Sequence, residues 1–167
     1  MELITVIMPF FKKKEYFKET YKSVINQSYQ NLEIIIIYDD NYKKDLEFIN
    51  NIIKGDKRVK VLNNDQNLGA GESRNIGIKK SNGSYIAFID CDDIWNEKKI
   101  KIQYDFMKKN NSKFSHTSYE IIDSLNNIIG LNIAKENINY ENLINSCDIG
   151  LSTVMVKKDL FEISYFK

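Results

Sequence analysis

The sequence is long enough for one folded domain and carries almost no net charge. It has 167 residues, of which 43% are hydrophobic and 12% aromatic, and its 24 basic and 23 acidic side chains give a formal net charge of +1. This composition excludes a disordered tail and argues against a nucleic-acid-binding protein that relies on a basic face.

Cysteine usage and hydropathy indicate the compartment. The two cysteines, Cys91 and Cys147, show no repeating spacing and favour a reducing environment, so we expect a cytoplasmic protein. No apolar run reaches the roughly 18 residues that a membrane-spanning helix needs. The first residues also lack the basic and apolar regions of a signal peptide. Any membrane association is therefore expected to be peripheral.

The chain up to Lys109 alternates between strand and helix patterns. Short continuous apolar runs predict strands that are buried on both faces, and apolar residues at helical spacing predict amphipathic helices. The strands are expected at residues 3–8, 32–40, 59–62 and 85–89, and the helices at residues 15–27, 46–53, 72–80 and 98–109. This order predicts an α/β domain with a mostly parallel sheet, flanking helices and right-handed crossovers.

The pattern changes after Asn111. Two β segments, residues 113–123 and 128–134, are separated by the turn sequence SLNN, so a short antiparallel addition to the sheet is expected. A weak helix near residues 140–145 and a strand over residues 152–156 follow. No linker, repeat or low-complexity tract divides the chain, and we expect a single domain over residues 1–167.

Acidic residues follow two of the expected strands directly, at residues 39–40 and at residues 90–93. The carboxyl ends of parallel strands meet at one edge, where open α/β sheets bind ligands. Because side chains on an extended segment alternate faces, Asp90 and Asp92 should share one side while Cys91 points to the other.

Clustered carboxylates without nitrogen or thiolate ligands favour a hard divalent cation such as Mg²⁺ or Mn²⁺ over zinc. Such ions usually bind through one or two carboxylates and complete their coordination with phosphate oxygens. The acidic edge therefore suggests a phosphorylated substrate.

Five sequence segments, in this order, resemble a known enzyme family. They are ITVIMPF, SVINQSYQNLEIIIIYDDN, NLGAGESRNIGI, GSYIAFIDCDDIW and LSTVMVKKDLFE. Together, over residues 3–162, they are similar to the N-terminal part of a family 2 glycosyltransferase with the GT-A fold. The resemblance implies transfer of a sugar from a nucleotide diphosphate donor, commonly a UDP-sugar, to a glycan or lipid-linked hydroxyl acceptor.

The resemblance also implies roles for matching residues. Asp39 would hydrogen-bond the nucleotide base, and Asp92 would hold the Mn²⁺ or Mg²⁺ ion that bridges the two phosphates. Asp90 would lie near the ribose and the sugar phosphate, and Pro9 would place the first loop against the base. Arg74 would lie near the nucleotide pocket or brace its loop.

Several of these residues also have a structural interpretation. Asp39 could cap a turn, a position that Asp favours. Arg74 could pair with Glu72 or with a carboxylate at a strand end. Trp95 could stack on a sugar or pack under the loop. The lysines at residues 12–14 could contact anionic lipid or phosphate, although we interpret them as solvated helix residues.

The implied reaction is metal-assisted displacement at the anomeric carbon. In inverting members of the family, a carboxylate general base deprotonates the acceptor hydroxyl. Asp148, Asp159 and Glu162 are carboxylates, but none lies in a matching motif. We therefore expect a C-terminally truncated domain that lacks the catalytic base.

The alternative is a sugar-nucleotide-binding module without turnover. A phosphatase with a nucleophilic aspartate fits less well, because its acidic motif follows the first strand rather than the fourth.

Overall fold

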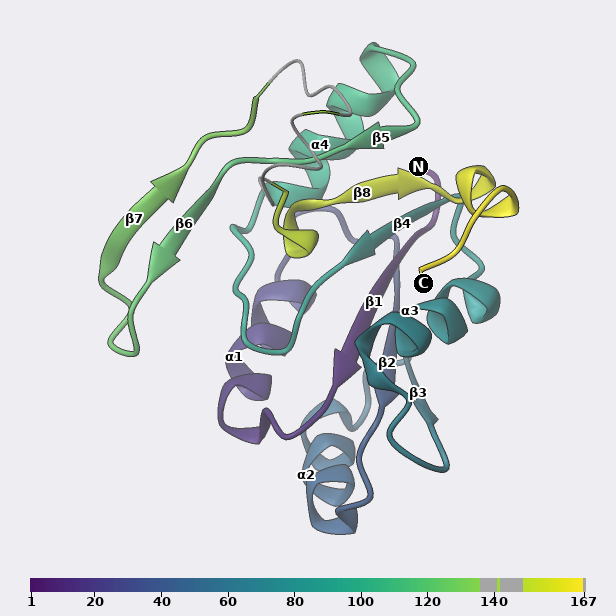
Figure 1. The fold of residues 1–167 in the computed structure, drawn as a ribbon, viewed down its shortest axis with the longest axis vertical. Coiled ribbons are helices and arrows are strands. Elements are labelled where there is room, and N and C mark those ends of the chain that lie inside the picture. The colour runs from purple at the N-terminus through teal and green to yellow at the C-terminus, as the bar shows by residue number, and fades with distance from the viewer. Residues whose placement is uncertain (136–140, 142–148, 167) are drawn as a thin grey trace.

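The structure is a computed structural model that describes residues 1–135, 141 and 149–166. Its centre is a six-stranded sheet in the order β3-β2-β1-β4-β8-β5 (Figure 1). The strands are β1 (Ile4–Phe10), β2 (Leu32–Tyr38), β3 (Val59–Asn63), β4 (Tyr85–Phe88), β5 (Phe114–Ser115), β6 (Tyr119–Ile122), β7 (Ile128–Asn132) and β8 (Met155–Lys157). The helices are α1 (Lys14–Ile25), α2 (Lys43–Ile53), α3 (Gly69–Lys80) and α4 (Lys99–Lys109), with the 3-10 helices η1 (Leu151–Thr153) and η2 (Lys158–Glu162).

The four strands at one side of the sheet run parallel, as predicted. β1 pairs with both β2 and β4, and β2 pairs with β3, all in parallel register. Ile4 at the start of β1 is aligned with Leu32 in β2 and Tyr85 in β4. The carboxyl ends of these strands consequently meet at one edge of the sheet.

The sheet is buried on both faces, which explains the continuous isoleucine run of β2. Ile34 and Ile36 face a core formed with α1, α2 and α4, whereas Ile35 and Ile37 face a second core formed with α3 and η2. All four side chains are fully buried. Helices therefore cover both sides of the sheet, and no polar face remains in β2.

The antiparallel part differs from the expectation. β6 and β7 form the expected hairpin, but this hairpin is a separate two-stranded sheet. The antiparallel addition to the main sheet comes from β8, which pairs with β4, and from β5, which pairs with β8. The hairpin carries many exposed apolar side chains, so neither of its faces is buried in the core: Ile121, Ile122, Ile128, Ile129 and Leu131.

Several other boundaries differ, among them the start of α2 at Lys43 rather than residue 46, and one expectation is not covered. The strand expected over residues 152–156 is divided into η1 and β8. α3 begins at Gly69, three residues before the expected start. Gly69 has a φ of +83°, a conformation that favours glycine. The helix expected near residues 140–145 lies outside the described residues except for Glu141.

α3 packs closely on the sheet because Gly77 faces β1. A Cβ atom at residue 77 would lie 2.7 Å from Cγ2 of Ile7. This close packing keeps the beginning of α3 at the carboxyl edge of the sheet. Within the described part of the chain, a helix with the length and apolarity required for a membrane span does not occur.

Candidate functional site

A cavity of about 450 Å³ lies at the edge of the sheet where the parallel strands end. We call it the carboxyl-edge cavity. Its lining comes mainly from the ends of β1 and β2, the start of α3 and the loop after β4: Pro9, Phe10, Phe11, Lys13, Asp39, Asn67, Gly69, Ala70, Arg74, Asp90, Cys91 and Asp92. The structure thus brings together all five residues that the sequence assigned to a nucleotide site, namely Pro9, Asp39, Arg74, Asp90 and Asp92.

Asp39 is only 2% exposed, and the chain itself binds its carboxylate. Oδ1 accepts hydrogen bonds from Asn64 Nδ2 at 2.7 Å and from the Leu68 N–H at 2.8 Å, and Oδ2 accepts one from the Gly69 N–H at 2.8 Å. Asp39 therefore caps the start of α3, where negative charge is favourable. A carboxylate offers about four acceptor positions. One acceptor position on Oδ2 therefore has no partner among the described residues.

Arg74 pairs with Asp90 across the cavity wall. Its Nη2 lies 2.6 Å from Asp90 Oδ1, and the arginine side chain is 12% exposed. The guanidinium carbon lies 5.7 Å from the ring centroid of Phe166. Its buried Nε has no hydrogen-bond partner in the described chain. The predicted pairing with a strand-end carboxylate is confirmed, and Glu72 instead accepts a hydrogen bond from Asn75.

Asp92 pairs with Lys13, which is a more exposed cation than Arg74. Its Oδ2 accepts a hydrogen bond from Lys13 Nζ at 2.7 Å, and the two side chains are 38% and 44% exposed, respectively. This bond to Asp92 raises the pKa of Lys13. Lys14 forms an ion pair with Asp45 at 3.0 Å. The side chains of Lys13 and Lys14 are 44% and 43% exposed, so both are solvated as interpreted, and each also pairs with a carboxylate from a distant part of the chain.

Cys91 lies between the two carboxylates in a turn rather than in the expected extended segment, and it lines the same cavity. It is 2% exposed, and its thiol donates a hydrogen bond to the carbonyl of Pro9 at 3.1 Å. Burial is the main cause that raises the pKa of this thiol. Cys91 therefore anchors the acidic loop to the end of β1 while Asp90 and Asp92 pair with cationic side chains.

Ser152 supports the same loop from η1. Its Oγ accepts a hydrogen bond from the Asp90 N–H at 3.0 Å and donates one to the Asp93 carboxylate. Its carbonyl accepts a hydrogen bond from the indole N–H of Trp95 at 2.8 Å. Trp95 is buried, which supports packing under the loop rather than stacking on a sugar. Desolvation and the neighbouring charges of Asp90 and Asp92 raise the pKa of Asp93.

Two residues of this arrangement were not assigned from the sequence. A signal for Lys13 existed, because the three lysines follow the first strand at the edge where the acidic groups gather. Ser152 had no local signal, since it lies 62 residues from Asp90.

The carboxylates of the cavity suit a hard divalent cation but form only part of a coordination shell. Asp90 and Asp92 supply oxygen ligands alone, which fits Mg²⁺ or Mn²⁺ and not zinc. Across the described residues, no three His, Cys, Asp or Glu side chains are grouped as a metal site. This donor set fits an ion that takes its remaining ligands from water and phosphate oxygens.

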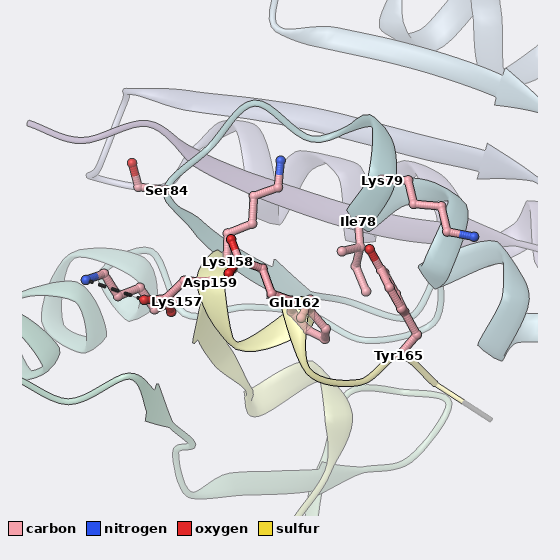
Figure 2. Close-up of a pocket in the computed structure, with 9 residues that line it drawn as sticks. Ile78, Lys79, Ser84, Lys157, Lys158, Asp159, Glu162 and Tyr165 are labelled. Atoms are coloured by element: carbon pink, nitrogen blue, oxygen red, sulfur yellow. Dashed lines mark ion pairs between the residues drawn. The ribbon is translucent and has the colours of Figure 1, made fainter.

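A second cavity, of about 460 Å³, lies where η2 and the residues after it pack against the end of α3 (Figure 2). Figure 2 shows Asp159 and Glu162 at this cavity. Its lining shares no residue with that of the carboxyl-edge cavity. Asp159 pairs there with Lys113 at 3.0 Å. Two of the three carboxylates considered as a catalytic base therefore lie elsewhere, and Asp148 lies outside the described residues.

Comparison with known proteins identifies the family. The model of "Glycosyl transferase family 2" matches residues 5–165. The chain belongs to this family. The family match covers the four parallel strands, the carboxyl-edge cavity and the segment from η1 to η2.

Two relatives of this family 2 chain extend beyond it. It is 37% identical over 166 residues to an uncharacterized glycosyltransferase of Haemophilus influenzae, which covers 99% of this chain and 66% of that protein. It is 36% identical over 162 residues to WfgD of Escherichia coli, named a UDP-Glc:alpha-D-GlcNAc-diphosphoundecaprenol beta-1,3-glucosyltransferase, over 95% of this chain and 61% of WfgD. The chain thus spans less than two thirds of the length of these relatives.

Solved structures confirm the GT-A fold of the chain. TarS 1–349 of S. aureus superposes with a TM-score of 0.77 at 20% identity, over 97% of this chain and 48% of that chain. The mannosyltransferase PcManGT from Pyrobaculum calidifontis, solved with GDP-Man and Mn²⁺, superposes with a TM-score of 0.72 at 11% identity, over 95% and 45% of the two chains.

Proposed function

We propose that the carboxyl-edge cavity binds the nucleotide diphosphate of a UDP-sugar together with Mn²⁺ or Mg²⁺, and that the complete protein transfers the sugar to a hydroxyl group with inversion. The observation that carries this proposal is the lining of the cavity. Three carboxylates (Asp39, Asp90 and Asp92) and two cationic side chains (Lys13 and Arg74) give it a formal charge of −1.

The charge of the cavity supports the participation of a metal ion. A sugar nucleotide brings a diphosphate with two negative charges, which a lining of charge −1 would repel in a partly desolvated site. A divalent cation held by Asp92 removes this repulsion. When bound, the cation would supply electrostatic stabilisation of the charge that develops on the departing diphosphate.

The remaining residues would orient the donor. Asp39 would accept a hydrogen bond from the nucleotide base through its remaining Oδ2 position, while its other bonds hold the start of α3. Asp90, fixed by Arg74, would face the ribose and the sugar phosphate. Pro9 would pack against the base.

The acceptor is proposed from the relatives. The name of WfgD specifies a UDP-Glc donor and an alpha-D-GlcNAc-diphosphoundecaprenol acceptor. We propose a lipid-linked or glycan acceptor for this protein as well. We also propose that the protein associates peripherally with the inner face of the membrane, where a lipid-linked acceptor would be accessible to it.

The general base is proposed to come from outside the described residues. Asp39, Asp90 and Asp92 each have a partner within the chain. Asp159 and Glu162 line the other cavity. We propose that the catalytic unit is longer than these 167 residues, as its relatives are. Because no described carboxylate at the site is free, donor binding without turnover is the second candidate for this chain.

Calorimetry tests the proposed binding. UDP is titrated into the chain with and without saturating Mn²⁺, and pyrophosphate serves as a ligand without a base. The proposal predicts Mn²⁺-dependent binding of UDP that is tighter than that of pyrophosphate. Equal UDP binding with and without Mn²⁺ contradicts the metal role, and the absence of binding contradicts the donor site.

A transfer assay then separates the two candidates. Transfer of labelled glucose from UDP-Glc to a lipid-linked diphosphate acceptor is measured with this chain and with a form extended to the length of its relatives. Transfer by the extended form alone supports the proposed glycosyltransferase. Binding without transfer in both forms supports the binding module.

A further inference from the structure

The two cations of the carboxyl-edge cavity are held in different ways. Arg74 is 12% exposed, is bonded to Asp90 and lies against the Phe166 ring. Lys13 is 44% exposed and meets Asp92 through a single ion pair at 2.7 Å, with its ammonium 5.7 Å from the Tyr16 ring centroid. Arg74 is therefore fixed by its surroundings, whereas Lys13 can change its partner without disturbing the core.

Lys13 binds Oδ2 of Asp92, the carboxylate that would hold the cation in the proposed function. The ammonium group is a compact charge on a flexible stem of four carbons. A divalent cation on Asp92 would repel this ammonium strongly, because the two positive charges would lie within a few ångströms of each other. The ion pair and a metal ion on Asp92 therefore compete with each other.

We propose that Lys13 occupies the cation position of Asp92 when the site holds no nucleotide, and moves to the diphosphate of the donor when a divalent cation binds. This inference rests on the proposed function. Lys13 also lines the cavity, so its ammonium group would be able to contact a diphosphate bound there. Lys13 is thus both a competitor of the metal ion and a binding residue for the nucleotide.

The exchange predicts two effects of opposite sign for Lys13→Gln. Without nucleotide, the affinity for Mn²⁺ should rise, because Asp92 no longer has an internal counter-charge. With saturating Mn²⁺, the affinity for UDP should fall, because the diphosphate loses a cationic partner. Exposed ion pairs are weak, so we expect changes of roughly three- to fivefold in each direction. If Lys13 only stabilised the fold, its substitution would not raise the affinity for Mn²⁺.

The chain offers two matched controls. Lys12→Gln removes the same charge one residue away, but the ammonium of Lys12 lies over the Phe11 ring at 4.9 Å and does not pair with Asp92. This variant should change either affinity by less than about twofold, because it tests only the general loss of positive charge. Lys13→Arg keeps the charge and should stay close to the parent protein in both titrations.

The experiment measures Mn²⁺ binding by the electron paramagnetic resonance signal of the free ion, and UDP binding by calorimetry in saturating Mn²⁺. Tighter Mn²⁺ binding together with weaker UDP binding in Lys13→Gln alone supports the exchange. Unchanged or weaker Mn²⁺ binding, or equal shifts in Lys12→Gln, overturns it.

If the parent protein binds neither Mn²⁺ nor UDP, the proposed function and this inference both fail. If the parent binds both and Lys13→Gln does not differ from Lys12→Gln, only this inference fails.

Discussion

The two sides of the carboxyl-edge cavity differ in how much of their polar chemistry the chain already uses. On the fixed side, Asp39 accepts three hydrogen bonds within the chain, and Asp90 is tied to the partly buried Arg74. On the adjustable side, Asp92 and Lys13 form one exposed pair. Residues of the fixed side should therefore couple binding to stability, whereas residues of the adjustable side should affect binding alone.

Asp39→Ala should cause the largest loss of stability. It removes three hydrogen bonds and the cap of α3, for which we expect a decrease of about 2–4 kcal/mol in the free energy of unfolding. Urea denaturation measures this loss. Asp65→Ala is the control, because Asp65 is an exposed carboxylate in the loop between β3 and α3 that Asp39 contacts. In the folded variant, the binding of UDP should weaken more than the binding of pyrophosphate. Equal weakening removes the base-reading role of Asp39.

Arg74→Ala should have the next largest effect. It leaves Asp90 without its counter-charge at a partly buried position and removes the contact with the Phe166 ring. We expect a loss of about 1–3 kcal/mol in stability, below the cost of breaking a fully buried pair because Asp90 is partly exposed. Arg74→Lys keeps the charge and should recover part of this loss. A stability equal to that of the parent protein would place Arg74 on the adjustable side.

Ser152→Ala should have a smaller effect on stability and a distinct effect on the acidic loop. The variant leaves the Asp90 N–H without its acceptor, for which we expect a loss of about 1 kcal/mol. Mn²⁺ affinity should fall with it, because the loop that carries Asp92 is less restrained. Ser152→Thr keeps the hydroxyl and should restore Mn²⁺ affinity. If Thr fails to restore it while the fold is intact, the hydroxyl does not position the loop.

Asp92→Ala should change stability least and metal binding most. Both partners of its ion pair are more than one third exposed, so the free energy of unfolding should stay within about 0.5 kcal/mol of the parent value. Mn²⁺-dependent binding of UDP should be lost in calorimetry. A large loss of stability in this variant, or retained Mn²⁺-dependent binding, would remove the distinction between the two sides.

The parts of this structure that follow from the sequence are those in which a local pattern has one physical solution. The isoleucine run of β2 requires burial on both faces, which indicated a parallel sheet and brought Asp39 and Asp90 to one edge. The same reasoning brings the lysines after the first strand to this edge, but it could not pair Lys13 with Asp92, which lies 79 residues away. Nor could it separate the hairpin of β6 and β7 from the main sheet, since a strand pattern does not reveal which strand it pairs with.

The start of α3 shows a different limit. Glycine at residues 69 and 71 lowers intrinsic helix propensity, so the sequence favoured a later start. The carboxylate of Asp39, which follows β2, accepts hydrogen bonds from the N–H groups of Leu68 and Gly69 and so stabilises the first turn of α3. A contact between distant residues here outweighs the local preference.

A crystal structure of the chain with UDP and Mn²⁺ tests the central claim most directly. The account predicts an anomalous scattering peak from manganese beside Asp92, with the diphosphate on the same ion and the uracil base next to Asp39. Manganese or nucleotide bound away from the carboxyl-edge cavity, with Asp39 and Asp92 contacting neither, would contradict it.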